Sequence, residues 1–203
     1  MLYKYLLETF GVNEPIFISD IQFDRSDIWI SKELAKLCEK SQLIRYERGI
    51  YYIPQQTIFG QSHLNPNKVI KRKYLSENGN SIGFYSGISA LQKIGLSTQM
   101  PNIPEIQTNN ENSNLRRVKV GNQEVILRKA RAKITNQNIS VLIFLDIMSN
   151  APASYLDEDK KAILSDWIKQ NNITRNLVSQ YAPAFPDRTM RNLVESGVIY
   201  YVT

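Results

Sequence analysis

The sequence predicts a two-domain protein of the α+β class. Within 203 residues, segments with helical periodicity alternate with short runs rich in β-branched and aromatic residues. A polar stretch with a proline at 55–66 separates two parts that are each long enough to bury a core. We therefore expect one domain at 1–58 and a mixed α/β domain at 64–203.

The N-terminal part of the chain predicts two helices and a hairpin. Ser26 or Asp27 can cap the second helix. A glycine-containing turn, 47–49, separates two β-prone runs. The expected helices cover 2–10 and 28–40, and the two β-prone runs cover 43–46 and 50–53. A helix, a short turn, a second helix and a hairpin in this order are typical of a winged helix-turn-helix.

The second part predicts helices around a hairpin with a two-residue turn at Gly121-Asn122. The apolar run 139–148 fits a helix or a strand, and helix is favoured because Asn138 or Ser140 can cap it. Strands are expected over 105–108, 115–120, 123–128 and 198–202, and helices over 66–75, 86–94, 139–148, 157–171, 174–180 and 186–196.

A helix about 10–12 Å wide fits the major groove of DNA, and a hairpin beside it can reach the flanking backbone. The candidate DNA-binding residues lie on the second helix, just after it and at the hairpin tip: Ser31, Lys32, Lys36, Lys40, Gln42, Arg45 and Arg48. Glu33, Glu39 and Glu47 lie among these cations. A winged helix that binds protein instead of DNA is therefore the alternative.

The excess positive charge lies in the middle of the chain. Residues 61–133 hold 12 basic and 4 acidic residues, net +8, whereas 1–60 and 134–203 each have net −1. The second basic patch consists of Arg116, Arg117, Lys119, Arg128, Lys129, Arg131 and Lys133. We expect it to add affinity for nucleic acid or to counter an acidic partner. A solvent-exposed hairpin and an RNA-binding surface are the alternatives.

Catalytic chemistry is not expected. The single histidine, His63, lies in the polar stretch without a nearby acid, and the single cysteine, Cys38, falls on the apolar side of its helix. Gly79, Gly83 and Gly87 lack the lysine of a phosphate-binding loop. We therefore predict no enzyme activity, no metal and no cofactor. The sequence shows neither a membrane span nor a secretory signal, so a cytoplasmic location is expected.

The run from Leu43 to Pro54 contains an R-G-x-Y-x-x-P pattern and resembles the wing of AbiEi-type antitoxins. The run from Gly95 to Pro101 resembles the start of the second domain in that family. The resemblance implies a regulator of an abortive-infection toxin–antitoxin operon that binds inverted repeats in its own promoter. It supports Arg45, Arg48, Gly49 and Tyr51 as wing residues.

The resemblance further implies a nucleotidyltransferase-like toxin that is countered without a stable complex. The alternative is a protein-interaction module whose basic second domain binds the toxin directly. An inverted repeat requires two copies of the chain on the DNA. The sequence leaves the oligomeric state open, and a monomer in solution that binds DNA as two copies is one arrangement.

Overall fold

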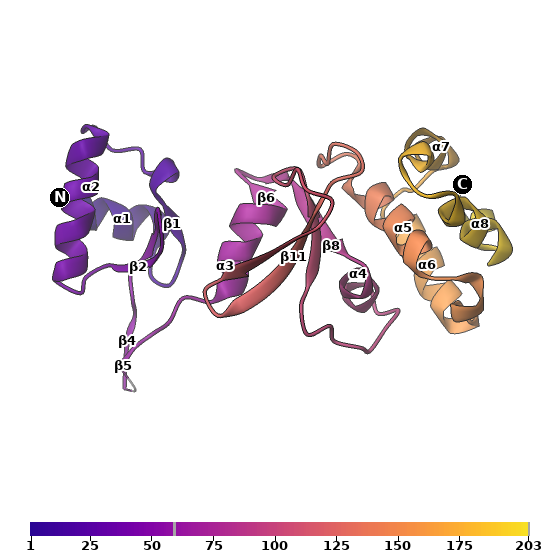
Figure 1. Cartoon of the computed structure of the whole chain (residues 1–203), viewed down its shortest axis with the longest axis horizontal. Coiled ribbons are helices and arrows are strands. Elements are labelled where there is room, and N and C mark those ends of the chain that lie inside the picture. The colour runs from indigo at the N-terminus through magenta and orange to yellow at the C-terminus, as the bar shows by residue number, and fades with distance from the viewer. Residues whose placement is uncertain (59, 203) are drawn as a thin grey trace. The chain divides into compact units, whose positions relative to one another are not determined.

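The computed structural model describes residues 1–58 and 60–202 (Figure 1). Phe59 and Thr203, the last residue of the predicted second domain, lie outside the described residues. Helices and small sheets are mixed along the chain, so the α+β class is confirmed. The chain divides into two compact units, Met1–Ile70 with Val120–Asn122, and the remainder from Lys71 onward. This division falls a few residues after the polar stretch where the sequence predicts a boundary.

The first unit is built from two helices and a three-stranded antiparallel sheet of order β1-β3-β2. Its elements are α1 (Leu2–Phe10), β1 (Ile16–Phe17), the 3-10 turn Ile18–Asp20, α2 (Asp27–Glu39), β2 (Ile44–Glu47) and β3 (Ile50–Tyr52). The predicted helices and hairpin are confirmed. Ser26 caps α2, because its side chain accepts a hydrogen bond from the backbone N–H of Trp29 at 3.4 Å.

The polar stretch after β3 contains structure that the sequence analysis does not expect. Two short strands pair there, β4 (Gln56–Thr57) and β5 (Gly60–Gln61). The helix expected over 66–75 is divided into α3 (Pro66–Ile70) and a turn of π-helix, Lys71–Leu75.

The second unit contains a four-stranded sheet of order β10-β11-β9-β8. Its strands are β8 (Gly83–Ser86), β9 (Glu105–Thr108), β10 (Arg116–Val120) and β11 (Gln123–Lys129). Two short strands that precede β8 in the sequence, β6 (Ser76–Glu77) and β7 (Asn80–Ser81), pair with each other as a separate hairpin. Strands β9 and β11 are parallel, whereas β8 and β9 are antiparallel. The hairpin and the strand at 105–108 are confirmed.

Strand β8 replaces the start of a predicted helix. The helix expected over 86–94 begins only at Ile88, as α4 (Ile88–Lys93), because Ser86 belongs to the strand. A Cβ at Gly83 would lie 1.9 Å from the backbone oxygen of Tyr74. Glycine is therefore needed where this strand meets the preceding turn.

The C-terminal helices are α5 (Ile139–Asn150), α6 (Glu158–Gln170), α7 (Arg175–Tyr181) and α8 (Asp187–Glu195), all as predicted. Asp157 caps α6 by accepting from the N–H of Lys160 at 2.9 Å. The strand expected over 198–202 is wrong, since Val198–Tyr201 forms a 3-10 helix. Val198 and Val202 are fully buried in the core that the surrounding helices form, and they do not pair with a strand.

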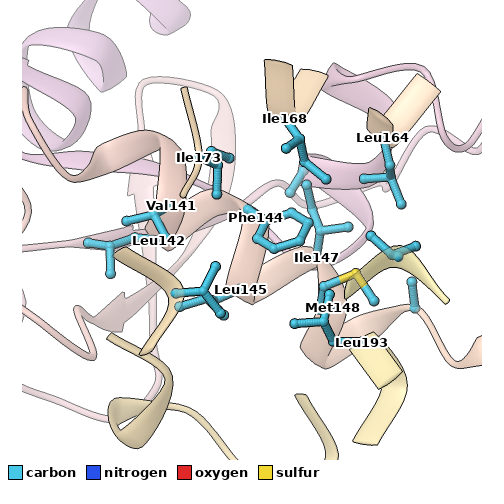
Figure 2. Close-up of a cluster of buried hydrophobic side chains, with 14 of the residues drawn as sticks. Val141, Leu142, Phe144, Leu145, Ile147, Met148, Leu164, Ile168, Ile173 and Leu193 are labelled. Atoms are coloured by element: carbon cyan, nitrogen blue, oxygen red, sulfur yellow. The ribbon is translucent and has the colours of Figure 1, made fainter. Parts of the chain in front are cut away.

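Helix α5 lies at the centre of the second unit's core (Figure 2). Side chains on every side of it are buried, which explains why its sequence shows no clear helical periodicity. Phe144 is fully buried and lies among side chains of α6 and α8, as Figure 2 shows for Ile168 and Leu193. Among residues 1–58 and 60–202, no helix is long and apolar enough to cross a membrane.

Candidate nucleic-acid interface

Helix α2 presents two different faces in the first unit. Ile30, Leu34 and Leu37 are buried against the core that α1 and β1 share. The polar face remains exposed, together with the end of the helix and the tip of the β2–β3 hairpin. We name this the α2–hairpin surface, and all seven predicted DNA-binding residues lie exposed on it: Ser31, Lys32, Lys36, Lys40, Gln42, Arg45 and Arg48.

The cations of the α2–hairpin surface differ in their partners. The Lys36 ammonium lies 3.2 Å from a carboxylate oxygen of Glu33. The Arg45 guanidinium donates a long hydrogen bond of 3.4 Å to the backbone oxygen of Glu47. Lys32, Lys40 and Arg48 make no ion pair within the described part of the chain. These three positive charges are therefore free to bind an anion in solution.

The start of α2 carries an exposed apolar residue that the sequence analysis does not single out. Ile28 is 70% exposed, although its neighbour Trp29 is packed against the core. The Trp29 ring stacks on Phe23 with ring centroids 5.8 Å apart, which fixes the first turn of the helix. Ile28 falls outside the spacing of Ile30, Leu34 and Leu37, and that departure is the signal that could have identified it.

The residues of the second basic patch form two groups. Arg117, Lys119, Lys129 and Lys133 are exposed, and no ion pair joins them to another described residue. Three arginines instead have partners within the second unit. Arg116 pairs with Glu111 at 2.7 Å, Arg128 pairs with Glu105, and the Arg131 guanidinium lies 5.4 Å from the centre of the Phe185 ring.

Glu111 gives Arg116 a structural role. This carboxylate is 5% exposed. Its burial would raise the pKa of Glu111, but hydrogen bonds from the backbone N–H of Ser113 and from Arg116 outweigh burial, and the pKa lies below its ordinary value. The guanidinium of Arg116 therefore stabilises a buried charge.

We expect Arg116→Ala and Arg117→Ala to have different effects. Arg116→Ala leaves the Glu111 carboxylate short of a donor and should lower the free energy of unfolding by about 1–3 kcal/mol. Arg117→Ala should stay within about 0.5 kcal/mol of the wild type, since its side chain is exposed. Urea unfolding of both variants measures this difference, and equal losses of stability would contradict the assignment.

A buried polar network joins the sheet to α5, and the sequence analysis misses it. One carboxylate oxygen of Asp146 accepts from the Ser86 hydroxyl at 2.9 Å and from the Gly87 N–H at 3.1 Å. The other accepts from the Gln107 amide at 2.6 Å. Asp146 is 2% exposed. A single acid within the apolar run 139–148 is the signal that could have revealed this network.

Burial raises the pKa of Asp146, and the hydrogen bonds from Gly87, Ser86 and Gln107 offset this only in part. Folding therefore favours the protonated acid, so the native state loses stability as the pH rises from the ordinary pKa through the raised one. The asparagine side chain of an Asp146→Asn variant is neutral at every pH, so this variant does not lose stability in that way.

We therefore expect the free energy of unfolding of Asp146→Asn, minus that of the wild type, to increase with pH. Urea unfolding between about pH 4 and pH 7 measures this difference. A difference that is constant or that falls with pH would contradict the assignment.

The remaining residues that the sequence singles out lie apart from these surfaces. His63 is exposed. Cys38 is half-buried against the core of the first unit, as expected, and burial raises the pKa of its thiol although Arg45 counteracts the shift. No cluster of three or more His, Cys, Asp or Glu able to hold a metal ion occurs among the residues that the structure describes.

Comparison with known proteins identifies a family. The family model described as "Family of unknown function (DUF6088)" matches residues 13–175. The match begins directly after α1 and ends at the first residue of α7, so it includes the α2–hairpin surface and the second basic patch. No curated protein matches the sequence. The matched segment covers most of the chain, and the protein therefore belongs to the DUF6088 family.

Proposed function

We propose that the chain is a DNA-binding transcription regulator that acts as the antitoxin of an abortive-infection toxin–antitoxin operon. The observation that carries the proposal is the α2–hairpin surface. There, Lys32, Lys40 and Arg48 are exposed on α2, directly after it and on the hairpin that follows, and none of them has an ion-pair partner among the residues that the structure describes. Lysine and arginine side chains arranged in this way bind the phosphates of a duplex.

The element order of the first unit supports a winged helix-turn-helix. Helix α1, strand β1, the 3-10 turn Ile18–Asp20, helix α2 and the β2–β3 hairpin follow one another, and β1 completes the sheet beside β3. In such a domain, α2 would enter the major groove while Arg45 on strand β2 and Arg48 in the hairpin turn contact the flanking backbone. Gln42 could then read a base edge at the end of the helix.

The second basic patch would extend the electrostatic contact. The exposed side chains of Arg117, Lys119, Lys129 and Lys133 would add affinity that is independent of the base sequence. Two copies of the chain on an inverted repeat of its own promoter would reduce transcription of the operon. The further partner under this proposal is a nucleotidyltransferase-like toxin, which would be countered in the cytoplasm.

A gel-shift assay with the DNA upstream of the chain's own gene tests the proposal. A retarded complex that survives an excess of scrambled duplex is the expected result. The absence of a shift at low salt and micromolar protein would overturn DNA binding. Competition by RNA as effective as that by the upstream duplex would favour an RNA-binding role, whereas co-purification with the neighbouring gene product would favour a protein-interaction module.

A further inference from the structure

A polar pocket of about 480 Å³ lies within the second unit. This volume is within the range of small-molecule sites, roughly 300–1,000 Å³. Its wall is formed by strands β9 and β11, the segment directly after β11, the loop before β10 and the 3-10 turn Ala182–Ala184. The lining residues are Gln107, Asn114, Arg128, Lys129, Ala130, Arg131 and Ala184.

The lining carries positive charge. Arg128, Lys129 and Arg131 line the pocket, and no acidic residue is among the lining residues. Glu105 holds the guanidinium of Arg128 in place from the neighbouring strand, and Arg131 lies against the Phe185 ring. Two of the cations are therefore positioned before any ligand binds. A pocket of this charge favours an anion, and arginine is well suited to the geometry of a phosphate.

Gln107 supplies an independent indication of a ligand. The residue is 3% exposed and lines the pocket. Its amide nitrogen donates to Asp146 at 2.6 Å and to the Ser86 hydroxyl at 3.0 Å, which fixes the orientation of the carboxamide. Its carbonyl oxygen, Oε1, is buried and has no hydrogen-bond donor within the described residues. A buried acceptor without a donor is rare in folded proteins.

Gln107 and Arg128 lie opposite each other on the parallel strands β9 and β11. Side chains of directly paired residues leave the same face of a sheet. The buried acceptor of Gln107 and the guanidinium of Arg128 therefore lie on one side of the sheet, whereas Lys129, the next residue along β11, pairs with Thr108 on the other side.

We propose that this pocket binds a nucleoside 5′-phosphate. The phosphate would pair with Arg128 and Arg131, and an N–H group of the base would donate to Gln107 Oε1. Inorganic phosphate lacks such a base, and an amino acid would bring an ammonium group close to the two arginines. The nucleotide has two sources, a free mononucleotide or the 5′-phosphorylated end of a strand. This inference does not depend on DNA binding by the first unit.

Isothermal titration calorimetry of the full chain tests the proposal, with AMP, GMP, CMP, UMP, the four nucleosides and inorganic phosphate as separate probes. We expect at least one mononucleotide to bind roughly tenfold or more tightly than both its nucleoside and inorganic phosphate. A dinucleotide with a 5′-phosphate, compared with its 5′-hydroxyl form, distinguishes the two sources. If only the phosphorylated dinucleotide binds, a strand end is the ligand. If neither form binds and no mononucleotide exceeds inorganic phosphate, the proposal is overturned.

Three variants locate the binding. Arg131→Gln should weaken nucleotide binding by roughly tenfold or more, because a charged donor is lost. Lys169→Gln removes an exposed charge on α6 that lies outside both basic surfaces and does not line the pocket, and it should leave nucleotide affinity unchanged. Gln107→Met should weaken the binding of the nucleotide and leave the affinity for inorganic phosphate unchanged. If Gln107→Met does not fold, the comparison of Arg131→Gln with Lys169→Gln decides, and equal nucleotide affinities in these two variants would contradict the assignment.

Discussion

Replacing Lys32, Lys40 and Arg48 together with alanine should weaken binding to upstream DNA and flatten its dependence on salt. Each phosphate contact contributes a slope of about 0.9 in the logarithm of affinity against the logarithm of salt concentration. Three lost contacts lower the slope by about 2.7. Between about 50 and 200 mM salt, the wild type should then lose about fortyfold more affinity than the variant does. Fluorescence anisotropy of a labelled duplex measures both slopes.

A matched control separates this effect from a change of net charge. Lys169, Arg188 and Arg191 are exposed on α6 and α8, and their replacement by alanine removes the same number of positive charges. We expect the control variant to keep nearly the wild-type slope, because these residues lie outside both basic surfaces. Equal slopes in the two triple variants would show that the α2–hairpin surface does not contact DNA.

Phe144→Ala should have the largest effect on stability. Phe144 is fully buried at the centre of the second unit's core, where its removal leaves a cavity (Figure 2). Such truncations cost about 3–5 kcal/mol. The two tryptophans report on different units, since Trp29 lies in the first unit and Trp167 in the second. Urea unfolding in a Trp29→Phe background therefore follows the second unit alone.

The same variant tests whether the first unit acts independently. Each unit has its own hydrophobic core, so we expect Phe144→Ala to leave the unfolding signal of Trp29 unchanged when Trp167 is replaced by Phe. DNA binding through the α2–hairpin surface should persist in Phe144→Ala. The control is Tyr200→Ala, because Tyr200 is 80% exposed and its loss should change stability by less than about 0.5 kcal/mol. Parallel loss of DNA binding and of the second unit's structure would contradict independent action.

Local chemistry explains which elements could be predicted. Ser26 and Asp157 mark the starts of α2 and α6 because their side chains accept from the first turn. Gly121 has φ 59°, which fits the two-residue turn expected between β10 and β11. By contrast, the run 198–202 has the composition of a strand, and only the surrounding helices, which bury Val198 and Val202, determine its 3-10 structure.

In the candidate sites, too, features that depend on local sequence could be predicted, whereas contacts between distant residues could not. Exposure of Lys32 and Lys36 follows from helical periodicity, so the polar face of α2 could be predicted. The pairing of Arg128 with Glu105 could not, because residues distant in sequence meet only through the parallel pairing of β11 with β9. The Ser86, Gln107 and Asp146 network likewise joins three separate elements. Asp146 within an apolar run indicates a buried acid, but a single sequence does not identify the distant residues that contact it.

Site-specific photo-crosslinking tests most directly whether the α2–hairpin surface contacts DNA. A benzophenone side chain introduced in place of Lys32 or Arg48 would be irradiated in complex with the upstream duplex, with the Lys169 position as the control. We expect crosslinks to DNA from positions 32 and 48 and none from position 169. Crosslinking from position 169 alone, or equal yields at all three positions, would contradict DNA recognition by α2 and its hairpin.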